Sequence, residues 1–371
     1  MNGGHHAVVI VGGGTAGCAT AIALAARGVK DVTVVDMLPE PAWRIGEAIP
    51  PAARPVLERL GLWDEFTAQG HLPSAGSCAS WGKAELGYND FVLAGQGKGW
   101  HLDRAAFDTM LAAKVCAGGG RIMRGLRLRE AERGGDKNYV LTFEECDGAR
   151  SQIVANFLVD ATGIAAGAAR RLRVVRNQID CIAVVSAIFN LNAPATVPSQ
   201  ALLEACEYGW WYAARIPGAR MIAALAVEPS RHRDYSGHAD FLAALRATRH
   251  VAQWFERGKA ALGENLKPET ALAPSAILSN VAGPRWLAVG DAASAYDPIS
   301  AQGILKALCD SEAAAEAISA FLATDDKTPL LAYQDAVFAR FRDYLRLRRH
   351  FYELESRWPR APFWQSRLRL A

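Results

Sequence analysis

Residues 7–17 read AVVIVGGGTAG, and this stretch decides the fold. Its apolar part, 7–11, is typical of a strand that is buried on both faces. The alanine-rich segment 15–27 follows as a helix, which Gly28 closes as a C-cap. Residues 32–35 form a second apolar strand. The order strand, glycine turn, helix and strand predicts a βαβ unit at the start of an α/β fold.

The glycine turn has the spacing G-x-G-x-x-G, with Gly12, Gly14 and Gly17 at its glycine positions. Gly12 allows a tight turn, Gly14 allows the backbone to approach a pyrophosphate, and Gly17 allows the helix to pack closely on the strand. Thr15 and Ala16 begin the helix, whose unpaired N–H groups and positive dipole end face the phosphates. The turn therefore predicts a dinucleotide site, with a purely structural glycine turn as the alternative.

Asp36 ends the second strand, 19 residues after Gly17. From that position a carboxylate binds a ribose 2′-hydroxyl, and the same carboxylate repels a 2′-phosphate. We therefore expect FAD or NAD, and not NADP, at this first site. The alternative is that Asp36 only caps the loop that follows it.

The composition is that of an ordinary globular chain of 371 residues with a formal net charge of +3. A charge so near neutral gives no electrostatic basis for binding nucleic acid or an anionic membrane. The seven cysteines are scattered and never closer than 25 residues, which argues against zinc motifs and for a reducing compartment. His5 and His6 lie in a start that we expect to be disordered, so no metal site is expected.

Residues 7–26 are almost free of charge and need to be distinguished from a membrane or secretory segment. Three consecutive glycines would weaken a spanning helix, and no basic residues precede the segment as they would in a signal peptide. We therefore expect neither a membrane span nor a signal, and a cytoplasmic location.

The rest of the chain alternates between helical and strand-like texture. We expect strands at 182–191, 209–216, 220–227 and 286–290, and short strands in the glycine-rich stretch 72–99 and in a meander over 126–163. Asp103 is expected to cap a helix at 104–117. Further helices are expected at 50–60, 237–257, 301–323 and 328–358.

A second motif lies far downstream of the glycine turn. Residues 286–293 read WLAVGDAA, and 297–304 read DPISAQGI before an alanine-rich helix. These residues resemble the Gly-Asp motif of FAD-dependent hydroxylases and halogenases with the p-hydroxybenzoate hydroxylase fold. The resemblance implies that Asp291 holds the flavin ribityl chain. It also implies a loop that places a helix start, and its dipole, at the pyrimidine edge through Pro298, Gln302, Gly303 and Ile304.

Three shorter segments resemble the same family. HLDRAAFD at 101–108 resembles its arginine-bearing helix start, which implies that Arg104 contacts the cofactor. VDATG at 159–163 resembles the strand end that closes the nucleotide domain, which implies a place near FAD for Asp160 and Gly163. The pair Gly46-Glu47, preceded by Arg44, resembles a segment beside the flavin, which implies cofactor contacts for Arg44 and Glu47. Noncovalent FAD is the expected cofactor.

The family's architecture implies a Rossmann-like FAD-binding domain interleaved with a β-rich substrate domain. We expect the FAD-binding domain to comprise residues 1–70, 100–175 and 272–325. The substrate domain would comprise 71–99 and 176–271, and a C-terminal helical segment would follow at 326–371.

The family includes halogenases, hydroxylases and prenyl-chain reductases, so the fold alone does not choose the reaction. Tryptophan-type halogenases carry a lysine upstream of a strand tryptophan, but no lysine stands between Ala68 and Trp81. They also carry Trp-x-Trp-x-Ile-Pro, where this chain has Tyr212 and Ala214 at the tryptophan positions. Both departures favour direct oxygen transfer from a flavin C4a-hydroperoxide, with O2 as cosubstrate, over halogenation.

The stretch GWWY at 209–212 and the stretch GWH at 99–101 resemble the flavoprotein monooxygenases that mature tryptophylquinone cofactors. The resemblance implies hydroxylation of a tryptophan side chain on a precursor protein, an oxidase or dehydrogenase. Strand alternation sends Trp210 and Tyr212 to one face and Trp211 to the other, so at most one face lines a pocket. The alternative is that Trp210, Trp211 and Tyr212 are hydrophobic core.

Glu47 and Asp297 are the candidates for a catalytic base that assists rearomatisation, with structural hydrogen bonding as the alternative role. No second glycine fingerprint is present, so NAD(P)H binds transiently or a partner flavin reductase supplies electrons. Three alternatives remain at this point: a halogenase or hydroxylase of a small or carrier-bound indole or phenol, a prenyl-chain reductase, and an FAD-binding protein without turnover. The basic stretch 340–369 is either a solvated helix face or a docking surface for an acidic partner.

Overall fold

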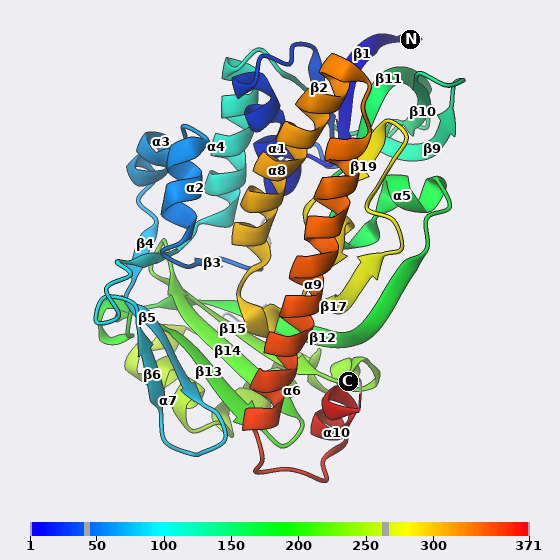
Figure 1. Ribbon diagram of the computed structural model, residues 1–371. Helices are drawn as coiled ribbons and strands as arrows, with labels where there is room; N and C mark the ends of the chain where they lie inside the picture. The colour runs from blue at the N-terminus through cyan, green and yellow to red at the C-terminus, as the bar shows by residue number, and fades with distance from the viewer. Residues whose placement is uncertain (1, 41–44, 262–266, 370–371) are drawn as a thin grey trace.

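The computed structural model describes residues 2–40, 45–261 and 267–369, which form two large sheets and a layer of helices (Figure 1). The first sheet has the order β18-β19-β11-β1-β2-β8. In that order its strands span Ala282–Gly283, Trp286–Ala288, Arg150–Asp160, Asn2–Val11, Val32–Val35 and Arg121–Met123. The strands from β19 to β8 run parallel, as the βαβ start predicts. Two antiparallel strands, β9 and β10, extend β11 at Arg127–Arg133 and Tyr139–Glu144.

Three helices cover the first sheet: α1 (Thr15–Ala26), α4 (Arg104–Ala117) and α8 (Gly303–Thr324). α1 packs against both α4 and α8, although α8 lies nearly three hundred residues away in the sequence. Half of its residues are alanine, and nine of its residues are buried, because small residues let the backbones of neighbouring elements approach closely. The parallel strands and α1 therefore form one core, which holds the glycine turn at its edge.

The second sheet has the order β20-β17-β12-β15-β14-β13-β5-β6. In that order its strands span Ser294–Ala295, Glu269–Leu278, Arg176–Leu191, Arg220–Val227, Gly209–Ile216, Ala201–Cys206, Gly76–Ser80 and Gly87–Asp90, and β16 (Ala260–Ala261) pairs with β12. A small sheet connects the two large ones through β3 (Ala48–Ile49), β7 (Gly99–His101) and β4 (Leu72–Ser74). Short helices complete the fold at Ala53–Arg59 (α2), Trp63–Ala68 (α3) and Gly167–Arg171 (α5).

The two faces of the second sheet bury different residues. Trp211 faces α6 (His238–Arg246), where its ring packs edge-on against Phe241 at 5.2 Å between centroids. Trp210 and Tyr212 point to the opposite face, toward the C-terminal helices. The alternation predicted for this strand is therefore confirmed, and only the face of Tyr212 is turned toward the first sheet.

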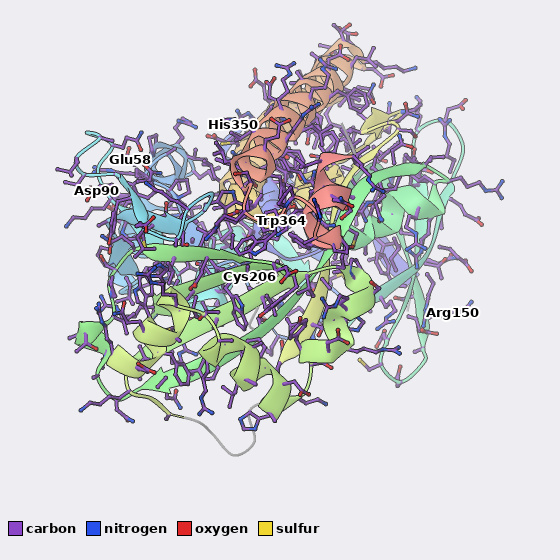
Figure 2. All side chains as sticks on the ribbon, turned by 90° about the horizontal axis from the view of Figure 1, so that it is seen from below. Glu58, Asp90, Arg150, Cys206, His350 and Trp364 are labelled. Atoms are coloured by element: carbon purple, nitrogen blue, oxygen red, sulfur yellow. The ribbon has the colours of Figure 1, made fainter. Side chains whose placement is uncertain are left out.

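The C-terminal segment forms two helices that join both sheets. α9 (Thr328–Leu354) runs beside α8, and α10 (Pro362–Leu368) lies on the second sheet (Figure 1). Figure 2 shows Trp364 of α10 close to Cys206, whose carbonyl accepts a hydrogen bond from the indole Nε1 at 3.0 Å. The basic stretch expected as an exposed run is partly structural, since the side chains of Arg348 and Arg367 are buried in ion pairs.

Two expectations about local structure are wrong. The helix expected at 237–257 is broken into α6 and α7 (His250–Arg257), because the carboxylate of Glu204 on β13 accepts the N–H groups of Arg249, His250 and Val251. A buried carboxylate from another strand thus caps a new helix start. The start of the chain is also ordered from Asn2, where β1 begins, and His6 is buried with its Nδ1 2.9 Å from Asp31.

The α/β fold class is confirmed: the first sheet has a parallel centre with antiparallel strands at its margins, and the second sheet is antiparallel apart from the parallel pair β13–β5. No helix in the described part of the chain is long and apolar enough to cross a membrane.

Candidate active site

The glycine turn has no room for side chains at two of its positions. A Cβ on Gly12, whose φ is +112°, would lie 2.2 Å from the Ala161 carbonyl oxygen. A Cβ on Gly17 would lie 1.8 Å from the Gly12 carbonyl oxygen. Gly14 is the N-cap of α1, and no side chain caps this helix or places an acid in its first turn. The free N–H groups at this start therefore suit a phosphate.

Asp36 lies beside the turn at the end of β2. Its carboxylate accepts hydrogen bonds from the N–H of Gly13 at 2.5 Å and from the N–H of Leu38 at 2.7 Å. The side chain is therefore held in one orientation at the edge where the adenosine end of a dinucleotide binds in this fold.

Arg104 is buried at the start of α4, although a first-turn arginine is usually solvated. Its Nη1 donates to the Gly46 carbonyl at 2.7 Å, and its Nη2 lies 3.3 Å from Asp108. Asp108 in turn accepts a hydrogen bond from the Thr15 hydroxyl at 3.0 Å. The Nε of Arg104 is buried without a partner in the described residues. An unsatisfied guanidinium N–H beside the glycine turn fits an anionic ligand.

Asp108 and Arg176 were not found by sequence reasoning. Asp108 follows Arg104 by one helical turn, which is the signal that identifies it once α4 is known. Arg176 begins β12 and bonds to the Ile164 carbonyl, while its Nη2 is a second buried guanidinium nitrogen without a partner among the described residues. The charge of Asp291 raises the pKa of Arg176, although burial lowers it overall.

The Gly-Asp motif meets the glycine turn in space. A Cβ on Gly290, whose φ is +60°, would lie 2.8 Å from the Cβ of Ala16 on α1. The next residue, Asp291, keeps 42% of its side chain exposed and lies 3.6 Å from the buried Nζ of Lys306. The structure therefore brings the two motifs together, with one partly exposed carboxylate at their junction.

The loop after this motif leads into α8. It begins with the short helical turn Pro298–Ser300 and passes through Ala301, which has a φ of +48°. Gln302 is the N-cap of α8, which Gly303 and Ile304 begin, and no side chain caps this start or places an acid in its first turn. The end of the helix is therefore available to stabilise negative charge.

Asp297 is fully enclosed at the start of this loop. One oxygen of its carboxylate accepts the N–H of Ile299 at 3.0 Å, and the other accepts the Tyr352 hydroxyl at 2.8 Å and the Arg348 Nε at 3.3 Å. Burial raises the pKa of Asp297, and Arg348 lowers it. Because Asp297 is paired with a buried guanidinium whose charge opposes its protonation, its geometry suits loop positioning better than proton transfer.

Glu47 is brought into contact with a residue of the second sheet. It lies next to β3 and is 3% exposed, and its Oε1 accepts a hydrogen bond from the Tyr212 hydroxyl at 2.5 Å. Its other oxygen accepts the N–H of Gly46 at 3.1 Å. Burial raises the pKa of Glu47, and burial and the neighbouring Glu47 raise that of Tyr212. The two residues that sequence reasoning named separately form one buried pair at the seam between the sheets.

Of the three aromatic residues expected to line a pocket, two are enclosed in the protein. Trp211 is completely buried beneath α6, on the face opposite to Glu47, which excludes it from a pocket there. Trp210 is 3% exposed beneath α9 and α10, and its Nε1 donates to the Tyr352 hydroxyl at 3.2 Å. Tyr212 retains a partly exposed ring while its hydroxyl is buried against Glu47.

The segment after β11 is held by its own contacts. Asp160 is completely buried, and its carboxylate accepts hydrogen bonds from the Thr162 N–H and hydroxyl and from the Ala169 N–H. Gly163 has a φ of +64° and lies at a half-buried turn with open space where a Cβ would be. Asp160 therefore shapes the turn that carries Gly163. Arg44 lies outside the described residues.

These residues fit FAD. The groups that could hold it are the uncapped starts of α1 and α8, the guanidinium nitrogens of Arg104 and Arg176 that have no partner among the described residues, and the partly exposed carboxylate of Asp291. Among the described residues, no three His, Cys, Asp or Glu side chains are grouped so as to hold a metal ion.

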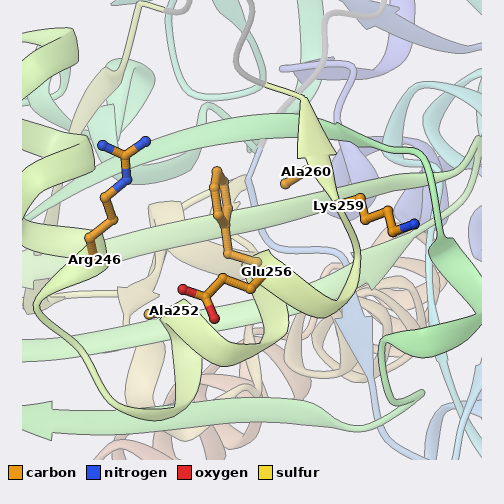
Figure 3. A pocket seen from close by; sticks show the side chains of 6 residues that line it. Arg246, Ala252, Glu256, Lys259 and Ala260 are labelled. Atoms are coloured by element: carbon orange, nitrogen blue, oxygen red, sulfur yellow. The ribbon is translucent and has the colours of Figure 1, made fainter.

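A separate cavity of about 360 Å³ lies between α6, α7 and β16 (Figure 3). It is lined by Arg246, Ala252, Phe255, Glu256, Lys259 and Ala260. Phe255 belongs to the core on the face of Trp211, which is opposite to the face of Tyr212. The cavity is therefore not part of the site around Glu47.

Comparisons with known proteins agree with this site. A family model described as an FAD binding domain matches residues 5–346. The FAD-dependent oxidoreductase LodB of Marinomonas mediterranea is 26% identical over 377 residues, which cover 97% of this chain and 96% of LodB.

Two solved structures have the same fold. The flavin-dependent halogenase CmlS superposes with a TM-score of 0.82 at 23% identity, over 98% of this chain and 67% of its own. The peptidyl tryptophan dihydroxylase QhpG, described as essential for tryptophylquinone cofactor biogenesis, superposes with a TM-score of 0.78 at 25% identity, over 98% of this chain and 78% of its own. Since the family model spans most of the chain and its motifs meet around one glycine turn, the protein belongs to the FAD binding domain family of flavin-dependent oxidoreductases.

Proposed function

We propose that this protein is an FAD-dependent monooxygenase that hydroxylates a tryptophan side chain of a precursor protein. The observation that carries the proposal is the buried Glu47–Tyr212 pair, which connects the segment expected beside the flavin with the substrate sheet. The similarity to a peptidyl tryptophan dihydroxylase, over nearly the whole chain, supports this substrate class.

FAD, when bound and reduced, supplies the activation of O2 for transfer of one oxygen atom. The chain binds it through the glycine turn, Asp36, Arg104 and Asp291. The uncapped start of α8 favours negative charge on the cofactor. Tyr212 and the enclosed aromatic residues behind it exclude water from the side facing the substrate sheet.

Glu47 is the proposed base. After oxygen transfer, the aromatic carbon must lose its proton for the ring to regain aromaticity, and burial raises the pKa of Glu47, which makes its carboxylate a stronger proton acceptor. Tyr212 donates to the same carboxylate and so holds it in one orientation. We therefore expect Glu47→Gln to lower product formation by about a hundredfold. Tyr212→Phe retains the base and should cost less.

Halogenation is the competing reaction in this family. It requires a group that handles the hypohalous species, and lysine serves this purpose in the tryptophan-type enzymes. Within the described residues the buried lysine is Lys306, which lies 3.4 Å from Asp310 and 3.6 Å from Asp291 and is thus paired with acids. No lysine stands between Ala68 and Trp81.

The proposal is tested by giving the FAD-loaded protein a reductant, isotopically heavy O2 and a tryptophan-containing segment of a precursor protein. We expect the peptide to gain the mass of heavy oxygen, with no change on adding chloride or bromide. Free tryptophan and indole serve as control substrates. A halide-dependent gain of halogen mass would assign the protein to the halogenases, and turnover confined to an isoprenoid alkene would assign it to the reductases.

A further inference from the structure

Tyr352 lies between the two halves of the site. It is completely buried in the last turns of α9, a helix to which sequence reasoning assigns no function. Its hydroxyl donates to the Asp297 carboxylate at 2.8 Å and accepts from the Trp210 indole at 3.2 Å. One hydroxyl group therefore contacts the loop before α8 and the substrate sheet at the same time.

The hydrogen bond from Tyr352 to Asp297 positions the start of the loop. The other oxygen of Asp297 accepts the N–H of Ile299, and the main chain of Asp297 accepts the Ser300 hydroxyl at 3.0 Å. The N–H of Asp297 donates to the hydroxyl of Tyr344, also on α9, at 2.7 Å. Any change in the position of Asp297 therefore changes the start of the loop that leads to Gly303.

The hydrogen bond between Trp210 and Tyr352 positions strand β14 of the second sheet. Trp210 precedes Tyr212 by two residues on β14 and faces the same side. The hydroxyl of Tyr212 binds Glu47. Tyr352 is thus connected through one strand to the proposed base, and through Asp297 to the proposed cofactor loop.

Charged neighbours fix this arrangement. Arg348, one helical turn before Tyr352, donates to Asp297 and to Asp180 on β12. Arg367 of α10 also lies 3.4 Å from Asp180. Asp297 and Asp180 are both paired with arginine, so neither buried carboxylate depends on Tyr352 for its charge balance. The hydroxyl of Tyr352 can therefore act as a neutral bridge between the loop and Trp210.

We propose that Tyr352 is a positioning residue that sets the loop at 298–303 and the β14 strand relative to each other. The proposal rests on the proposed function, which places FAD at that loop and the substrate beside β14. If Tyr352 only filled the core, it would contribute through the packing of its ring alone. Removal of its hydroxyl would then not change how the loop and β14 affect each other.

A double-mutant cycle of Tyr352→Phe and Trp210→Phe tests the coupling, with the dissociation constant of FAD as the readout. Trp210 also has a path to the cofactor side through β14, Tyr212 and Glu47, so the coupling between the two variants, and not the effect of Trp210→Phe alone, reports on the bridge. We expect Tyr352→Phe to raise the FAD dissociation constant about tenfold and Trp210→Phe about threefold. In the Tyr352→Phe background, Trp210→Phe should add nothing.

Two matched variants provide controls. Tyr333→Phe removes a buried hydroxyl from the same helix, whose partner is the Ala288 carbonyl. Trp364→Phe removes an indole from the same aromatic cluster, whose partner is the Cys206 carbonyl. Trp364→Phe should show no coupling with Tyr352→Phe. Multiplicative effects of Trp210→Phe and Tyr352→Phe, or unchanged FAD binding in both, would overturn the proposal.

The yield of hydroxylated product for each O2 consumed provides the second readout. Tyr352→Phe should lower this yield, with the remaining O2 leaving as H2O2. If the proposed function is wrong, the unmodified protein forms no hydroxylated tryptophan, while the FAD cycle still decides whether Tyr352 couples the two sides. If Tyr352→Phe does not fold, Asp297→Asn takes its place in the cycle, and Trp210→Phe should then add nothing in the Asp297→Asn background.

Discussion

Asp291 is the residue at which the two sequence motifs converge, and its partly exposed carboxylate is available to a ligand. Asp291→Ala removes a charged acceptor from a ribose-type hydroxyl, which costs about 1.5–3 kcal/mol of binding free energy. We expect the FAD dissociation constant to rise about tenfold to a hundredfold, measured by titrating FAD into the apoprotein. Asp343→Ala, on the exposed side of α9, is the control. Full flavin retention by Asp291→Ala would disprove this assignment.

The ionisation of Glu47 should appear in the pH dependence of stability. Because its pKa in the folded protein is raised above the ordinary value of 4.5, its contribution to stability is complete below that pH. The contribution is lost as the pH rises through the raised pKa. The Glu47→Gln variant cannot ionise at this position. Its Tm should therefore rise relative to the Tm of the unmodified protein as the pH rises above about 4.5.

Thermal unfolding of the FAD-loaded proteins across this pH range provides the measurement. Glu316→Gln, an exposed change on α8, is the control for a general effect of charge. A Tm difference that stays constant with pH would mean that Glu47 does not titrate as its burial requires.

Sequence patterns identify the roles of residues whose partners lie nearby along the chain. The Asp103 cap accepts the Ala106 N–H, and the glycines of the turn are required by contacts around α1. Asp108 and Tyr352 could not be assigned functions in advance, because their partners Thr15 and Trp210 come from distant segments. Their contacts form only in the folded protein, where α4 and α9 bring them to these partners.

At the level of elements, α10 is held by buried charge. The guanidinium of Arg367 bonds to Glu228 and to the Cys181 carbonyl, and it lies 3.4 Å from Asp180. Arg367→Ala removes the buried charged bonds to Glu228 and to the Cys181 carbonyl, although Arg348 still pairs with Asp180, and this loss costs about 1.5–3 kcal/mol. We expect a clearly lower free energy of unfolding in urea, while Arg369→Ala, on the exposed end of α10, changes little. Equal stability of the two variants would contradict the structural reading of the basic stretch.

Some boundaries of helices and strands follow from local sequence signals, and others do not. β14 and β15 have the predicted limits, because alternating and apolar patterns with a Pro-Gly turn between them are local signals. The break between α6 and α7 has no local signal of that kind, since the cap comes from Glu204 on β13. Tertiary contacts overrode helix propensity there.

At the scale of the whole molecule, the segment that carries Glu47 meets the second sheet at Tyr212, and we propose that these two parts hold the cofactor and the substrate. The family is established by the match over residues 5–346. The choice of hydroxylation over halogenation rests on particular residues, namely the absence of lysine between Ala68 and Trp81 and the presence of Tyr212 and Ala214.

The most direct test of this choice is mass spectrometry of an oxidase precursor expressed with and without this protein. We predict that a tryptophan of the precursor gains oxygen mass only when the protein is present, and that Asp291→Ala abolishes the gain at limiting FAD. Growth with added bromide should leave the product unchanged. A precursor whose tryptophans keep their original mass in the presence of FAD-loaded protein, or gain halogen instead of oxygen, would contradict the account.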